Sequence, residues 1–126
     1  MFRKSRIATA AATLAVSLFA LTGIADAAGS SSQVSILGTN GDYYGYVRSS
    51  DASHCESNRK VTVFKQLATT QDPHVDQKIG TDIAEPNGPD AMWSIGNSGF
   101  KTGKFYAKAA KVSGYCKAAT SATITR

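Results

Sequence analysis

Hydrophobic and polar residues alternate with a period of two along much of the chain after residue 32. The clearest case is 59–66, where Val61 and Val63 share one face and Thr62 and Phe64 the other. Similar short runs, rich in β-branched and aromatic residues, are separated by Gly, Asn, Asp, Ser and Pro. The pattern predicts about seven strands, at 33–37, 43–48, 59–66, 78–83, 91–95, 104–111 and 121–125.

Two segments between the predicted strands contain Asn-Gly pairs, and a third segment could form either a helix or a strand. Residues 38–42 contain an Asn-Gly pair, which predicts a tight turn. Residues 85–90 bracket a second Asn-Gly pair with two prolines, so we expect a turn with no regular structure there. Residues 104–111 are rich in Ala and Lys and could form a short helix, but their alternation and the neighbouring strands favour a strand.

After residue 27 we find no sustained helical periodicity, so the fold class is all-β. Several short strands with turns every 8–15 residues are typical of an antiparallel β-sandwich, in which one core layer lies between two sheets. The expected core residues are Val61, Val63, Ile83, Trp93, Phe105 and Ile124.

The first 27 residues predict a secretory signal peptide. Residues 1–6 carry three basic side chains and no acid, the run 7–24 is free of charge, and Ala25-Asp26-Ala27 is a small-x-small triplet. A membrane anchor is the alternative, but the run is rich in Ala, Thr and Ser and ends in a cleavage triplet. We expect cleavage after Ala27, a secreted product, a flexible leader at 28–32 and a sandwich domain at 33–126.

The two cysteines, Cys55 and Cys116, predict one disulfide. An exported chain meets an oxidising compartment, and two cysteines allow a single intramolecular pairing. Closing a loop of about 60 residues stabilises a fold by up to about 4 kcal/mol in the chain-entropy model. A redox pair or a metal thiolate site is disfavoured, because the two residues are far apart and have no further cysteines beside them.

The charge is mildly basic and unevenly distributed. Removing 1–27 takes away three basic residues and one acidic residue, which reduces the formal charge of +5 to +3. Residues 94–126 nevertheless hold six basic side chains and no acid. Such a face could attract anionic polymers, although a solvated strand face is the simpler interpretation. No Arg-rich or aromatic–basic pattern is present, so no nucleic-acid partner is expected.

The second half of the chain resembles a bacterial extracellular sandwich pattern, and 59–63 after Cys55 is similar to its first half. The matching segments are Thr81-Asp82, Trp93-Ser94-Ile95, 102–108, Cys116 and 121–124. The pattern resembles carboxypeptidase-regulatory-like or transthyretin-like domains and, more distantly, the B-type repeats of collagen adhesins. The resemblance implies an immunoglobulin-like or transthyretin-like sandwich that serves as a spacer, an adhesive module or an accessory part.

The motifs that could carry catalysis depart from their patterns. Residues 96–99 place the second glycine one position too early for a nucleophile elbow, and 99–104 miss both the glycine spacing and the Ser or Thr of a P-loop. His54 and His74 stand beside acids and could in principle hold zinc or copper, but solvated loop histidines are the simpler interpretation. We therefore expect no enzyme, no metal and no cofactor.

The tyrosines suggest a surface. On a strand, Tyr44 and Tyr46 share one face and Tyr43 lies on the other. The simpler interpretation is that these tyrosines fill the rim and core of the sandwich, but an exposed pair can stack on sugar rings or anchor an interface. With Lys104 and Lys108 they form the candidate binding surface of a secreted, non-catalytic interaction module at or outside the cell envelope. Its partner would be an extracellular protein or polysaccharide. The alternatives are a self-associating structural component and a small metal-dependent hydrolase.

Overall fold

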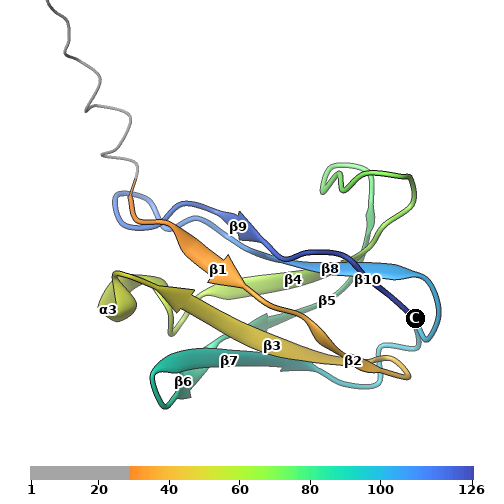
Figure 1. Cartoon of the computed structure of the whole chain (residues 1–126), viewed down its shortest axis with the longest axis horizontal. Helices are drawn as coiled ribbons and strands as arrows, with labels where there is room; N and C mark the ends of the chain where they lie inside the picture. The colour runs from red at the N-terminus through yellow and green to blue at the C-terminus, as the bar shows by residue number, and fades with distance from the viewer. Residues whose placement is uncertain (1–28) are drawn as a thin grey trace, which may run out of the picture.

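The computed structural model describes residues 29–126, so the predicted signal peptide at 1–27 lies outside the described residues. The chain forms two antiparallel sheets and one helical turn, α3 (Ala52–Cys55) (Figure 1). The first sheet contains β1 (Ser32–Val34), β2 (Leu37–Thr39), β3 (Asp42–Ser49), β6 (Glu85–Asn87) and β7 (Asp90–Ile95). The second contains β4 (Lys60–Lys65), β5 (Gln77–Ile83), β8 (Lys104–Ala109), β9 (Ala119–Thr120) and β10 (Ile124–Thr125).

One continuous segment passes from the second sheet to the first. The order of the first sheet is β1-β3-β7-β6, with β2 also on β3, and that of the second is β10-β8-β4-β5, with β9 on β8. The segment 77–87 pairs with β4 and then, as β6, with β7. Ala84, between the two parts, is fully buried and exchanges backbone hydrogen bonds with Asn58 and Arg59. The two sheets are thereby joined along this edge.

A single core occupies the space between the inner faces of the two sheets. Val61, Val63, Trp93 and Phe105 are buried in it, and Ile124 packs against it while partly exposed. Tyr43 contributes from the first sheet: its ring centroid lies 4.8 Å from that of Phe105, and its hydroxyl donates to the Phe100 carbonyl. The remaining buried members of this core are Ile36, Val47, Ala84, Ala91, Ala107 and Ala109.

The prediction that Ile83 belongs to the core is wrong, because its side chain is 48% exposed. Ile83 lies directly opposite Lys60 in the β4–β5 pair, and directly opposed residues share a face of a sheet. A bulge at Val63/Phe64 shifts the register, so that Ile79 packs against the core instead. The simple alternation of the sequence contains no sign of this bulge.

Each of the seven predicted strand segments contains a strand, although the first is split into β1 and β2. The segment 104–111 forms the strand β8 and not a helix. The expectation of irregular structure at 85–90 is wrong, since β6 and β7 form a hairpin there. Gly88 takes a positive φ of 65°, and Pro89 follows it at the position that needs a negative φ, as in a type II′ turn.

The predicted flexible leader at 28–32 is also wrong for the described residues. Ser30 donates to the Tyr115 carbonyl and accepts from the Lys117 amide, and β1 begins at Ser32. Gly29 approaches the Tyr115–Cys116 backbone so closely that a Cβ would lie 2.4 Å from the Tyr115 carbonyl carbon. The folded domain therefore begins before residue 33.

Candidate functional site

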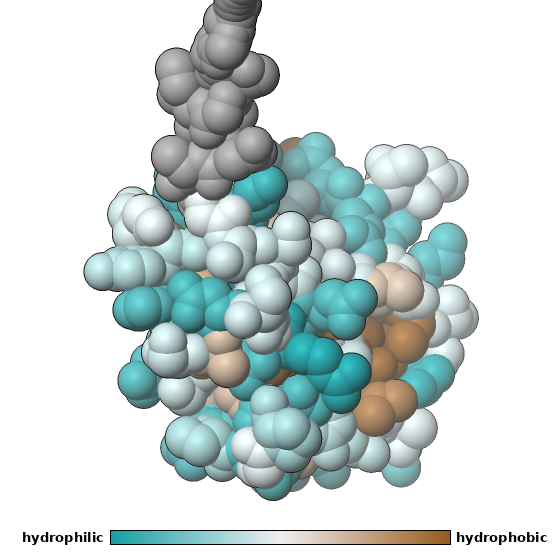
Figure 2. Space-filling view, turned by 60° about the vertical axis from the view of Figure 1, so that its left-hand side comes forward, coloured by the Kyte–Doolittle hydropathy of each residue, from teal (hydrophilic) through white to brown (hydrophobic). Residues whose placement is uncertain are grey.

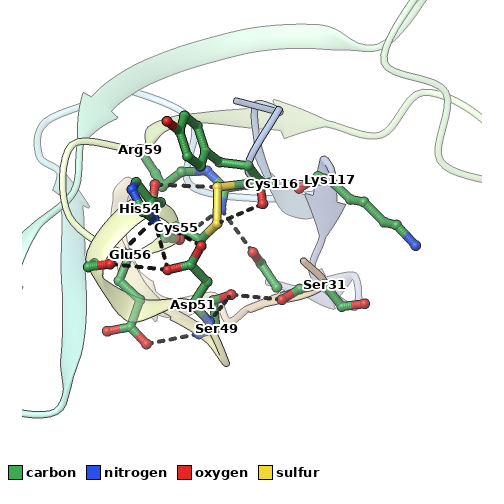
Figure 3. Close-up of a disulfide and its surroundings, with 12 residues drawn as sticks. Ser31, Ser49, Asp51, His54, Cys55, Glu56, Arg59, Cys116 and Lys117 are labelled. Atoms are coloured by element: carbon green, nitrogen blue, oxygen red, sulfur yellow. Dashed lines mark hydrogen bonds and ion pairs between the residues drawn. A yellow bond between two sulfur atoms is a disulfide. The ribbon is translucent and has the colours of Figure 1, made fainter. Parts of the chain in front are cut away.

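The predicted disulfide joins Cys55, at the end of α3, to Cys116 (Figure 3). Both cysteines are buried. The rings of His54 and Tyr115, the residues that precede the two cysteines, stack with their centroids 4.1 Å apart. The bond therefore closes a packed end of the molecule, where α3, the N-terminal segment and the turn at 112–117 meet.

Beside the disulfide lies a buried arginine that sequence reasoning missed. Arg59 is 1% exposed and has no carboxylate partner among the described residues. Burial lowers the pKa of its guanidinium, but the side chain stays charged, because arginine is not deprotonated in proteins. Its hydrogen bonds, at 2.8–3.1 Å, go to the carbonyls of Cys55, Ala110 and Lys117 and to the hydroxyl of Ser32. An arginine at the start of a strand normally predicts an exposed side chain, so no sequence signal marked it.

The two histidines each contact an aspartate of their own loop. The Nδ1 of His54 lies 3.0 Å from the Asp51 carboxylate, and that of His74 lies 3.5 Å from Asp72. The hydrogen bond from His54 holds the pKa of Asp51 below its usual value. In the part of the chain that the structure describes, no three His, Cys, Asp or Glu side chains are grouped as a metal site would require.

A buried carboxylate fastens the loop between β4 and β5. One oxygen of Asp76 accepts from the Tyr106 hydroxyl at 2.6 Å and the Asp72 amide at 2.7 Å, and the other accepts from the Leu67 amide at 3.0 Å. Burial alone would raise the pKa of Asp76, but these hydrogen bonds outweigh it and lower the pKa. Burial and the neighbouring carboxylate raise the pKa of Tyr106. The loop is thus held against the outer face of the second sheet.

The outer face of the first sheet carries the two exposed tyrosines. Tyr44 and Tyr46, both on β3, are 38% and 36% exposed, and Leu37 lies opposite Tyr44 on β2. Each tyrosine borders a shallow depression. The one beside Tyr46 is lined by Ser32, Gln33, Val34, Ser35, Arg48 and Thr120, and the one beside Tyr44 by Leu37, Gly38, Thr39, Asn40, Asp42 and Arg126. We call Tyr44, Tyr46 and these depressions the tyrosine face.

The predicted binding surface is not one surface. Lys104 and Lys108 lie on β8 of the second sheet, whereas the tyrosines lie on β3 of the first. Phe105 and Ala107 alternate with these lysines and point into the core, so the lysines face outward on the opposite side of the molecule from the tyrosines. The grouping of all four residues is therefore wrong, because the sequence does not say which sheet each strand joins.

One face of the molecule is mostly polar. Figure 2 shows a surface dominated by hydrophilic and neutral residues, with one compact hydrophobic area. Within 29–126, no helix has the length and hydrophobicity needed to cross a bilayer.

Comparison with known proteins gives no match: no family model fits the chain, and no curated protein and no solved structure resembles it significantly.

Proposed function

We propose that this chain is a secreted, non-catalytic β-sandwich module of immunoglobulin-like or transthyretin-like type. It binds an extracellular polysaccharide through the tyrosine face. The observation that carries the proposal is the exposed Tyr44–Tyr46 pair, in which each tyrosine borders a shallow depression.

The geometry suits sugar rings. Two residues of a strand span about 7 Å, so the two tyrosine side chains stand next to each other on one face. A tyrosine ring offers a flat apolar surface with a polar tip, and the depressions add hydroxyl, amide and guanidinium groups that can hydrogen-bond sugar hydroxyls. The Arg48 guanidinium is held in place by two bonds to Asp90, at 2.8 and 2.9 Å.

The buried charged groups support a role without catalysis. Arg59, Glu56 and Asp76 all bind backbone groups of the chain itself, and Glu56 accepts the Ser49 amide at 2.8 Å. These groups stabilise loops and do not line either depression of the tyrosine face. Export is supported by the predicted signal peptide and by the disulfide, which persists in oxidising compartments.

The test is co-sedimentation of the exported protein with insoluble cellulose, chitin and xylan. We expect one of these neutral polysaccharides to be bound and the Tyr44→Ala/Tyr46→Ala variant to bind at least about tenfold more weakly. Tyr115→Ala removes a tyrosine that is 48% exposed but lies outside the face, and it serves as the matched control. Equal binding by the parent and the double variant contradicts the proposal.

The same variants distinguish polysaccharide binding from the alternative, a self-associating structural component. If the tyrosine face mediates self-association, sedimentation velocity shows an oligomer for the parent and a monomer for the double variant, and no polysaccharide is bound. Intact mass and N-terminal sequencing of the exported protein test secretion. We expect an N-terminus at Ala28 and a mass two hydrogens below that of the reduced form.

A further inference from the structure

We infer that the outer face of the second sheet holds a second binding site, a lysine groove that takes an extended anionic polysaccharide. This site is independent of the tyrosine face. Its lining includes four lysines, Lys60, Lys78, Lys108 and Lys111, together with Pro73 and His74 of the loop between β4 and β5. Only Lys108 of this set was expected from the sequence to bind a partner.

The sheet register brings the lysines to one face. Lys60 lies on β4, Lys78 on β5 and Lys108 on β8. Lys108 is opposite Thr62, and Lys78 is opposite Phe64, two residues further along β4. With strands about 5 Å apart and about 7 Å per two residues, the three backbone positions are separated by about 8–14 Å. That spacing suits a polymer with anionic groups at intervals better than a single small anion.

The structure shows no ion pair between a lysine of the groove and a carboxylate of residues 29–126. Among residues 29–126, the contacts between acidic and basic side chains are Arg48–Asp90, Asp51–His54 and Asp72–His74, and none involves a lysine. Asp76 belongs to the loop beside the groove, but it is buried and its oxygens already accept three hydrogen bonds. An anionic ligand would therefore meet ammonium groups without a competing carboxylate in contact with them.

Hydrogen bonds within the chain hold the wall of the groove in place. Pro73 and His74 lie in a turn in which the Val75 and Asp76 amides donate to the Asp72 carbonyl, at 3.0 and 2.8 Å. The His74 amide donates to the Asp72 carboxylate at 3.0 Å. Asp76 then fastens the turn to Tyr106 of β8. A ligand entering a preformed groove spends little free energy on ordering the loop.

The side chains favour a polysaccharide over a nucleic acid. Single-stranded nucleic acids bind to exposed aromatic rings on which bases stack. Phe64, which lines this groove, and its neighbour Tyr106 are 3% and 0% exposed and stack on each other instead. The exposed His74 imidazole is then the one aromatic ring that the groove offers, which is too few for successive bases to stack on. The groove has no arginine for bidentate recognition, and lysines serve as point charges for phosphate or carboxylate alike.

The experiment measures binding of the exported protein to polygalacturonate, to phosphorylated dextran and to a DNA oligonucleotide, with unmodified dextran as the uncharged control. We expect the Lys60→Gln/Lys108→Gln variant to bind the carboxylate or phosphate polymer about tenfold more weakly, with a smaller salt dependence. The Lys101→Gln/Lys104→Gln variant loses the same charge outside the groove and should bind as the parent does. Thermal melting confirms that both variants fold.

The outcomes are distinct. Binding to only one of the anionic polymers identifies carboxylate or phosphate as the recognised group and supports the inference. Three results overturn the inference. They are equal weakening of binding in both lysine variants, absence of binding to either anionic polymer at low salt, and tighter binding of DNA than of the anionic polymers. The Tyr44→Ala/Tyr46→Ala variant should keep its affinity for the anionic polymer. If that affinity falls as much as in the Lys60/Lys108 variant, the separate groove is refuted, whereas loss of neutral-polysaccharide binding alone concerns only the tyrosine face.

Discussion

Two buried charges, Arg59 and Asp76, stabilise separate parts of this molecule, and neither forms an ion pair with another residue of 29–126. Arg59 donates to three carbonyls and a hydroxyl beside the disulfide. Asp76 accepts from two amides and a phenol over the second sheet. Burying an ion is costly unless its hydrogen bonds replace those of water, and here neutral dipoles do so. Each charged side chain thereby holds backbone segments that lie outside the strand pairs.

The two regions differ in how they are closed. The Arg59 region has a covalent cross-link as well, and its guanidinium stays charged at any accessible pH. The Asp76 region depends on hydrogen bonds alone, and its carboxylate can be protonated. We therefore expect that removing Arg59 or the disulfide destabilises the whole domain, whereas removing the Asp76 carboxylate loosens only the loop between β4 and β5.

Arg59→Met should have the largest effect. Methionine fills part of the volume but leaves the Cys55, Ala110 and Lys117 carbonyls without their donor. We expect the free energy of unfolding to fall by about 3–5 kcal/mol. Denaturant unfolding measures it, and Arg59→Lys should recover only part, because lysine lacks the planar fork. A methionine variant as stable as the parent would show that the buried charge orders nothing.

Reduction of the Cys55–Cys116 bond should come second, at about 2–4 kcal/mol. The measurement is thermal melting with and without reductant. Hydrogen exchange then locates the change: residues near α3 and Ser30 should lose protection before the loop that contains Asp76. Earlier loss in that loop would contradict the division into two regions.

Asp76→Asn should have a smaller and more local effect. We expect faster hydrogen exchange in 67–76 with little change near the disulfide. The pKa of Asp76 is lowered in the folded state, so its stabilisation is present above the ordinary pKa of about 3.9 and is lost as the pH falls below it. The parent should therefore lose stability more steeply than Asp76→Asn in that acid window. Parallel pH profiles would remove Asp76 as the cause.

Arg48→Gln should have the smallest effect. The Arg48–Asp90 pair has good geometry, yet the arginine side chain is 66% exposed, and exposed pairs contribute little. We expect no measurable change in the melting temperature. A decrease in the melting temperature comparable to that of Asp76→Asn would mean that exposed charges stabilise the fold as much as buried ones do.

Local chemistry explains why some features were predictable. Tyr43 alternates with Tyr44 and Tyr46, so the period of a strand places it on the opposite face, and the structure shows that the face of Tyr43 is the buried one. Asn40 and Gly41 take positive φ angles of 57° and 86°, as an Asn-Gly turn requires. By contrast, the exposure of Ile83 depends on a bulge in the pairing with another strand, and nothing within 77–83 encodes that register.

The candidate sites show the same limit. Alternation along a strand is enough to place the tyrosines on one face and the lysines of β8 on another, and two cysteines can pair only with each other. Packing of the two sheets places those faces on different sheets, brings Lys60, Lys78 and Lys108 together, and buries Arg59 and Asp76. The physical reason is range: alternation and turn preference act between neighbouring residues, whereas sheet order and the burial of a charge depend on partners brought together from distant parts of the chain.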